Sequence, residues 1–287
     1  MELEMNEATL EMVDKSNLET SLTEPGIWFI ADMLSDAGIC RKVNQDACCV
    51  RTMKIEDHIL VMAAVCDGVG GFQEGDYASR STVQSLNDWF DYTVSKNIRG
   101  KSQKELMDYL QAETEQRIRN QNSMIYKYAM EKKIRIGTTL TLLVIVNYEY
   151  FTAQVGDSRA YHIRDGLTQL TEDQSLVAQE IKAGRLSAEE ARHDKRRNII
   201  LQCIGGAEDL HIVYRKGEVC KEDVFFLCSD GFIHELGEGE IEKLFDPKLL
   251  QDRVSVKERI RNAISLVKER GEKDNITVVL VKVQEKL

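Results

Sequence analysis

Hydrophobic positions along the chain fall into two kinds of pattern. Short apolar runs, several of them rich in Val, Ile, Phe or Tyr, predict β-strands. Longer segments in which apolar residues recur every three or four positions predict amphipathic helices. The expected strands cover residues 27–30, 47–53, 59–66, 140–146, 151–155, 224–228 and 276–283.

The expected helices are grouped between clusters of strands. One covers about residues 76–95, and a second begins after Ser102, where Glu105 three residues later completes a capping box. A third carries regularly spaced apolar residues over 256–267 and ends at Gly271. Because strands and helices do not alternate strictly, the order favours an α+β fold in which antiparallel sheets are covered by helices.

The chain of 287 residues is long enough to bury one large core, and no Pro- or Gly-rich linker divides it. We therefore expect one domain over residues 25–287. Residues 1–24 contain seven acidic residues and one lysine, with scattered Leu and Met. This composition favours a flexible acidic tail, and the alternative is a short helix that docks on a partner.

Charge and cysteine content narrow the classes of partner and compartment. The net charge of −10 opposes the approach of a phosphate backbone, so nucleic acid is not an expected partner. The seven cysteines include no C-x-x-C pair, which is typical of reduced thiols in a cytoplasmic protein. No apolar run approaches the length needed to span a membrane, and we expect no membrane partner.

Four aspartates mark the ends of expected strands. Asp67, Asp157 and Asp230 follow apolar runs, and Asp274 precedes one. A single Asp-Gly after a strand is usually a turn signal. Four carboxylates gathered at neighbouring strand ends would repel one another unless a cation held them. Oxygen ligands without His or Cys indicate Mg²⁺ or Mn²⁺ rather than zinc.

Seven motifs in order resemble those of the metal-dependent serine/threonine phosphatases, the PPM or type 2C family, in its bacterial form. They are "RKVNQD", "DGVGGFQEGDYAS", "GTTLTLLVI", "VGDSRAYHIRDGLTQLTEDQS", "RRNIILQCIGG", "LCSDGF" and "DNITVV". The resemblance spans residues 36–283. It implies a four-layer αββα sandwich, in which two antiparallel sheets are flanked by helix pairs and a binuclear Mn²⁺ or Mg²⁺ site lies at one end.

The resemblance assigns metal ligands by position. Asp67 would bridge the two ions, the carbonyl of Gly68 would bind one of them, and Asp230 and Asp274 would bind the other. Asp157 matches the residue that, with the Asp230 position, holds a third ion in many bacterial members. All five positions are therefore expected at one end of the sandwich.

Three residues are expected to act in catalysis. Arg41 matches the phosphate-binding arginine, although an arginine taken alone is more often a solvated surface residue. Asp46 matches an acid that orients metal-bound water, and Asp67 is the bridging ligand.

Two positions depart from common members of the family. Val69 replaces a histidine, so a metal-bound water must protonate the leaving oxygen, and Gln45 replaces a glutamate near the second ion.

The function that this resemblance implies is hydrolysis of phosphoserine and phosphothreonine in proteins, by attack of a metal-bridging hydroxide and without a covalent phosphoenzyme. An opposing serine/threonine kinase is expected. Residues 171–210 correspond to a flap beside the active site that would influence substrate choice, and the alternative is a solvated charged helix. The alternative function is a pseudophosphatase, a module that binds phosphoproteins or regulates a partner without turnover.

Overall fold

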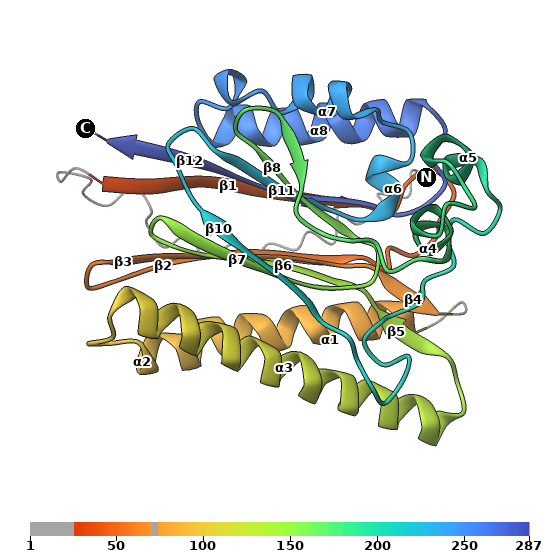
Figure 1. Cartoon of the computed structure of the whole chain (residues 1–287), viewed down its shortest axis with the longest axis horizontal. Helices are drawn as coiled ribbons and strands as arrows, with labels where there is room; N and C mark the ends of the chain where they lie inside the picture. The colour runs from red at the N-terminus through yellow and green to blue at the C-terminus, as the bar shows by residue number, and fades with distance from the viewer. Residues whose placement is uncertain (1–25, 71–73, 287) are drawn as a thin grey trace, which may run out of the picture.

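Two five-stranded antiparallel sheets form the centre of the protein in the computed structural model, which describes residues 26–70 and 74–286 (Figure 1). The expected acidic tail lies outside the described residues. One sheet has the order β1-β12-β11-β8-β9: β1 (Gly26–Asp36), β12 (Ile276–Lys286), β11 (Val224–Cys228), β8 (Arg159–Ile163) and β9 (Leu167–Gln169). The other has the order β10-β7-β6-β3-β2: β10 (Val213–Glu218), β7 (Glu149–Val155), β6 (Leu140–Val146), β3 (His58–Cys66) and β2 (Ala47–Ile55).

Helices cover the outer face of each sheet, and the expected four-layer αββα sandwich is confirmed (Figure 1). The lower layer contains α1 (Gly75–Asp88), the π-helical η1 (Trp89–Val94), α2 (Ser95–Asn97) and α3 (Gln103–Lys132). The upper layer contains α7 (Glu238–Leu244), the 3-10 turn η2 (Pro247–Leu249) and α8 (Arg253–Glu269). The three helical segments predicted from the sequence are all present, the first of them interrupted by the π-helical turn.

Local sequence explains where the long helix α3 begins and which face it buries. Ser102 and Glu105 form the predicted capping box, in which the Ser102 amide donates to Glu105 Oε2 over 2.9 Å. Positions three and four apart then face the sheet. The buried apolar residues on this face are Leu106, Met107, Leu110, Ile118, Ile125 and Ala129. Packing of this face, rather than helix propensity alone, stabilises the helix.

Strand β3 shows why an uninterrupted apolar run is needed in this architecture. Alternate side chains of a strand point to opposite faces, and both faces of β3 are buried. Leu60, Met62, Ala64 and Cys66 belong to the cluster between this sheet and helices α1 and α3. Val61, Ala63 and Val65 belong to the cluster between the two sheets. The strand is therefore fixed on both sides, and so is the start of the next segment at Asp67.

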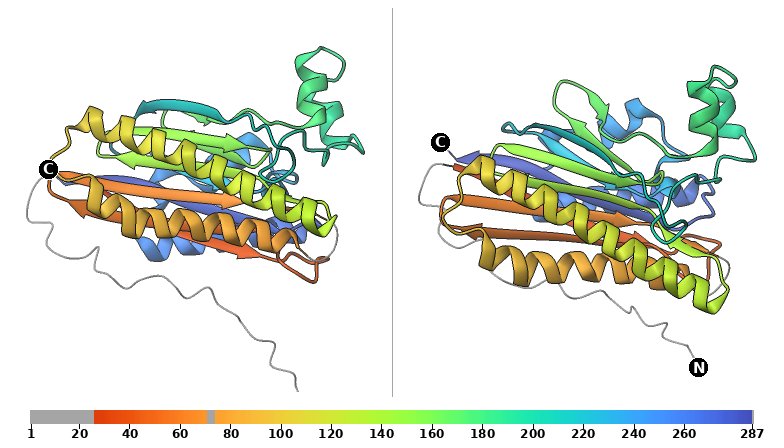
Figure 2. Two further views of the ribbon diagram at one scale, coloured as in Figure 1. Left: turned by 90° about the horizontal axis from the view of Figure 1, so that it is seen from below. Right: turned by 60° about the horizontal axis from the view of Figure 1, so that its bottom comes forward.

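One end of the sandwich carries most of the irregular structure. A two-stranded sheet pairs β4 (Gly68–Gly70) with β5 (Ile136–Thr138), and the short helix α6 (Asp230–Ile233) follows β11. Two short helices, α4 (Leu176–Lys182) and α5 (Ala188–His193), stand out from the body beside this end (Figure 2). Among the described residues, no helix combines the length and the apolar character needed to cross a membrane.

Candidate active site

The predicted site residues meet at this end of the sandwich because of the strand directions. Strands β3 and β7 both lie next to β6 and run in the same direction, so Asp67 and Asp157, which follow them, lie at the same end of the sheet. In the facing sheet, the end of β11 pairs with the start of β12, which brings Asp230 close to Asp274. Burial, followed by repulsion from Asp46, Asp230, Asp157 and Asp274, raises the pKa of Asp67 well above its ordinary value.

Asp46 is buried beside this group. Thr277 donates its hydroxyl to Asp46 Oδ2 over 2.6 Å, which fixes the orientation of the carboxyl group. Burial raises the pKa of Asp46 to about 7, although the hydrogen bond from Thr277 acts in the opposite direction. The other oxygen, Oδ1, is buried and has no hydrogen-bond partner within the described part of the chain. Asp46 therefore presents one fixed and one uncommitted oxygen.

Three buried carboxylate oxygens without a hydrogen-bond partner from the described residues indicate whether the site suits divalent cations. Asp157 Oδ1 and Asp230 Oδ1, like Asp46 Oδ1, are buried without a hydrogen-bond partner among residues 26–70 and 74–286. A buried polar atom normally has a partner, and hard oxygen ligands suit Mn²⁺ or Mg²⁺. The donor set fits these ions in its chemistry. In the same described residues, however, no three His, Cys, Asp or Glu side chains are arranged as a ready-made metal cage.

The close approach of neighbouring backbone carbonyls explains why a glycine, Gly68, follows Asp67. A Cβ added to Gly68 would lie 2.4 Å from the carbonyl oxygen of Gly75 and 2.6 Å from that of Gln45, so only glycine fits. The Gln45 side chain lies against the same backbone, because its Nε2 would be 2.7 Å from a Cβ on Gly75. The Gly68 carbonyl would be 3.0 Å from that Cβ. Position 45 is therefore part of the predicted metal-binding edge.

Arg41 reaches the site from the loop between β1 and β2. Its Nη2 donates to Asp274 Oδ2 over 2.8 Å, and its side chain is 51% exposed. The hydrogen bond to Asp274 is the largest cause of a raised Arg41 pKa, with smaller contributions from the charges of Asp67 and Asp230. The structure thus places this arginine beside the carboxylates with much of its guanidinium accessible to a ligand.

His234 is a member of the site that sequence reasoning missed. Its Nε2 lies 3.6 Å from Asp230 Oδ2 and its Nδ1 lies 3.1 Å from Glu272 Oε2. Glu272 Oε1 in turn accepts hydrogen bonds from the amides of Lys273 and Asp274. Burial alone would lower the pKa of His234, but the hydrogen bond to Glu272 and the charges of Asp230 and Glu272 raise it. His234 therefore links the segments that carry two predicted metal ligands.

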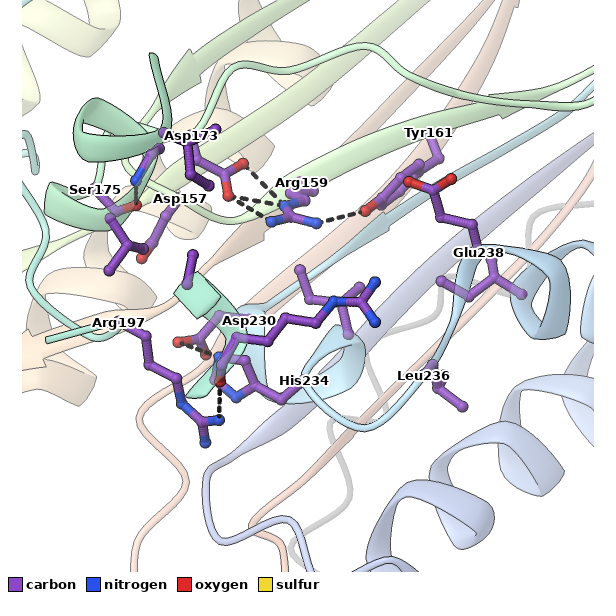
Figure 3. Close-up of a pocket in the computed structure, with 17 residues that line it drawn as sticks. Asp157, Arg159, Tyr161, Asp173, Ser175, Arg197, Asp230, His234, Leu236 and Glu238 are labelled. Atoms are coloured by element: carbon purple, nitrogen blue, oxygen red, sulfur yellow. Dashed lines mark hydrogen bonds and ion pairs between the residues drawn. The ribbon is translucent and has the colours of Figure 1, made fainter. Parts of the chain in front are cut away.

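A signal for His234 was present in the sequence. It follows Asp230 by four positions in "DGFIH", and residues four apart share a helix face. Figure 3 shows His234 beside Asp230 in the pocket that adjoins the site. A pair of histidines at metal-binding spacing would not have indicated His234, because it contacts the carboxylates of Asp230 and Glu272 and not a second histidine.

A sandwich of two antiparallel sheets with carboxylates gathered at one end is the architecture of the metal-dependent protein phosphatases. The sequence model of the family described as Protein phosphatase 2C matches residues 41–264. The chain belongs to this family.

Named relatives agree with this assignment. The chain is 31% identical over 253 residues to "Serine/threonine phosphatase stp" of Listeria innocua, with 88% of this chain and 94% of that protein covered. The solved serine/threonine phosphatase of S. agalactiae is 29% identical, with a TM-score of 0.73 and coverage of 88% and 99%. The catalytic domain of the phosphatase PstP, solved in complex with two manganese ions, is 25% identical, with a TM-score of 0.71 and coverage of 90% and 99%.

Proposed function

We propose that this protein is a metal-dependent serine/threonine protein phosphatase that hydrolyses phosphoserine and phosphothreonine in proteins. The observation that carries the proposal is the set of buried oxygens of Asp46, Asp157 and Asp230 that have no hydrogen-bond partner in the described part of the chain, at one end of the family's sandwich and near the accessible Arg41. The Listeria and streptococcal relatives, which are named as serine/threonine phosphatases, support the same activity.

The ligands proposed for two Mn²⁺ or Mg²⁺ ions are Asp67, the Gly68 carbonyl, Asp230 and Asp274. Asp157, together with Asp230, is the proposed ligand set for a third ion, and its uncommitted Oδ1 supports this role. When bound, the ions supply a nucleophile at neutral pH by lowering the pKa of water, and they offset negative charge on the phosphoryl group. The relative solved with two manganese ions supports the choice of metal.

Arg41 is proposed to bind the phosphoryl oxygens. A guanidinium group donates two parallel hydrogen bonds to a phosphate, and its hydrogen bond to Asp274 Oδ2 holds the side chain at the site. A dianionic phosphate is repelled by the surrounding carboxylates, so Arg41 also contributes needed positive charge. Its role is therefore binding and orientation of the substrate.

Asp46 is proposed to orient the attacking water and accept its proton. Thr277 fixes Oδ2, which leaves Oδ1 free to accept a hydrogen bond. Val69 offers no group that can protonate the leaving oxygen, so water supplies that proton.

Residues 25–287 are proposed to form one catalytic domain, with residues 171–210 as a flap that helps to choose the substrate. The projecting position of α4 and α5 at this end of the sandwich supports the flap (Figure 2), since Val177, Ala178 and Ile181 of α4 line the same cavity as Asp157 and Asp230. An opposing serine/threonine kinase follows from the chemistry, because a phosphatase acts on proteins that a kinase has modified. All seven cysteines are free, which supports a reducing compartment and hence the cytoplasm.

Hydrolysis of an aryl phosphate distinguishes this function from the alternative, a pseudophosphatase. The chelated protein is assayed without added metal and again with Mn²⁺ or Mg²⁺. Turnover that appears only with the metal supports the enzyme. Binding of a phosphopeptide without any turnover in the presence of both metals would instead identify a pseudophosphatase.

A further inference from the structure

A cavity of about 140 Å³ lies between the projecting helices and the body of the protein (Figure 3). Asp157 and Asp230 line one side of it, so it is continuous with the predicted metal centre. Charged, polar and apolar side chains share the rest of its wall, and the apolar ones come from both sides. The body contributes Ile233, Leu236 and Ile241, and the projecting segment contributes Val177, Ala178 and Ile181.

Three of the polar side chains that line the cavity, Arg159, Asp173 and Tyr161, are joined by hydrogen bonds. Arg159 donates from Nη2 to Asp173 Oδ2 over 2.6 Å and from Nη1 to the Tyr161 hydroxyl over 2.9 Å. The charge of Arg159 is therefore paired, and it does not require an ionic ligand. The aliphatic side chains named above supply the apolar part of the wall.

Two arginines lie at the rim, on the segment that follows α4. Arg192 and Arg197 line the cavity, and neither forms an ion pair with a carboxylate of the described residues. Arg197 donates to the backbone carbonyl of Arg192 over 3.0 Å, which holds the two residues together. Their remaining donors suit the carbonyl oxygens of a peptide chain that enters the cavity with an apolar side chain.

We propose that this cavity is a subsite for one aliphatic side chain of the phosphoprotein substrate, at a position near the phosphorylated residue. The inference rests on the proposed function. An apolar cavity of about 150 Å³ holds a group the size of benzene, so a Leu, Ile or Met side chain fits this volume. Because Asp157 and Asp230 line both places, a substrate that presents its phosphoryl group to the metals brings a neighbouring side chain to the cavity.

The test compares peptides that differ in one residue. A leucine is placed in turn at each position on either side of phosphoserine, in a peptide that otherwise contains serine and glycine. We expect the wild-type enzyme to prefer leucine at one position by about ten-fold in kcat/KM over the serine peptide, since one small apolar group in a pocket is worth about that much.

Matched variants assign the preference to the cavity. Ile181 lines the cavity and is 39% exposed, whereas Ile199 is 46% exposed on the same projecting segment and does not line it. Ile181→Ser is expected to lower the leucine-to-serine ratio of kcat/KM several-fold. Ile199→Ser is expected to leave that ratio and the hydrolysis of an aryl phosphate unchanged. Ala178→Leu fills the cavity and should lower the ratio by a second route, and thermal melting verifies the fold of each variant.

The outcomes separate this inference from the proposed function. Hydrolysis of the aryl phosphate by the wild type with equal kcat/KM for every peptide would overturn the subsite and leave the phosphatase standing. A preference that persists in both Ile181→Ser and Ala178→Leu would also overturn it. If neither peptide nor aryl phosphate is hydrolysed with Mn²⁺ present, the proposed function fails and the subsite fails with it.

Discussion

Arg41 Nη2 donates a hydrogen bond to Asp274 Oδ2 over 2.8 Å, across 233 positions of sequence. The proposed phosphate-binding residue is therefore tied to a proposed metal ligand. Asp274 is held in turn by its backbone amide, which donates to Glu272 Oε1 over 2.9 Å. The residues proposed to bind substrate and those proposed to bind metal therefore share one set of contacts at this end of the sandwich.

Arg41→Ala is expected to raise KM for phosphopeptides more than it lowers kcat. The phosphate carries negative charge in the ground state and in the transition state, so much of this contact is uniform binding. Arg41→Lys should recover only part of the loss, because an ammonium group cannot donate two parallel bonds in a fixed plane. Steady-state kinetics of the three proteins measures this. A large fall in kcat at unchanged KM would show that Arg41 acts mainly on the transition state.

Gln45→Glu is expected to tighten the more weakly held Mn²⁺ by about ten-fold, or about 1.4 kcal/mol. The Gln45 side chain lies against Gly75, close to the Gly68 carbonyl, and a carboxylate there adds a full charge. Coulomb attraction between the carboxylate and the ion at about 4 Å approaches roughly 4 kcal/mol with an effective dielectric of about 20. An intervening water molecule and the desolvation of the carboxylate remove most of this energy.

Calorimetric titration of Mn²⁺ measures the effect of Gln45→Glu. The matched control is Gln84→Glu, which adds the same charge at an exposed position of α1 and should leave the affinity unchanged. Unchanged affinity at every site in Gln45→Glu would mean that position 45 does not interact with the ions.

Asp46→Asn is expected to stabilise the chelated protein at pH 8 more than at pH 4. Burial raises the folded-state pKa of Asp46 from 3.8 to about 7. Because the folded-state pKa is raised, the protonated Asp46 carboxyl contributes fully to folding stability below about pH 4, and this contribution is lost as the pH rises through about 7. An amide removes this dependence and still accepts the hydrogen bond from Thr277. Thermal melting in chelator across this range checks the sign. A gain in melting temperature that is equal at both pH values would contradict it.

His234→Ala is expected to lower the free energy of unfolding by about 1–3 kcal/mol, because it leaves the buried Glu272 carboxylate without its side-chain partner. His193→Ala is the control, since His193 and its partner Glu189 are both more than 75% exposed. Such a surface change usually alters stability by less than about 0.5 kcal/mol. Chemical denaturation compares the two variants. Equal effects would show that the link through His234 does not stabilise the fold.

Apolar runs predicted the strands whose sequences are rich in apolar residues, including the edge strands β1 and β2, but they missed strands with more polar sequences. All seven expected strands are present, because their apolar side chains pack in the hydrophobic core clusters. The pattern missed β8 and β10. In β8 the polar residues Arg159 and His162 interrupt the apolar pattern; in the structure Arg159 pairs with Asp173, and His162 Nε2 lies 3.1 Å from Asp223 Oδ2. Strand β10 is an edge strand with several exposed side chains, and its sequence therefore lacks an apolar run. Strands β4, β5 and β9 are too short to give a pattern.

The helix expected as one segment over residues 76–95 contains a π-helical turn at Trp89–Val94. Trp89 and Phe90 are adjacent, and both are buried. The spacing of apolar residues cannot reveal such a turn in advance, because a π-helical turn changes the backbone hydrogen bonding over only a few residues of a longer helix.

Local sequence also predicted part of the site. Aspartates at strand ends could be found because a buried strand fixes the position of the residue after it, as β3 fixes Asp67. The specific roles came from the resemblance and stay predictions. The contacts of His234 with Asp230 and Glu272 could not be predicted, because Glu272 lies 38 positions away and meets His234 only in the folded chain.

The most direct test of the account is the hydrolysis of a phosphoserine peptide by the wild type and by Asp67→Asn, each chelated and then titrated with Mn²⁺. We expect no turnover in chelator, recovery of the wild type as Mn²⁺ is added, and no recovery of Asp67→Asn, although that variant melts as a folded domain. Turnover that survives exhaustive chelation, or a near wild-type kcat in Asp67→Asn, would contradict the account.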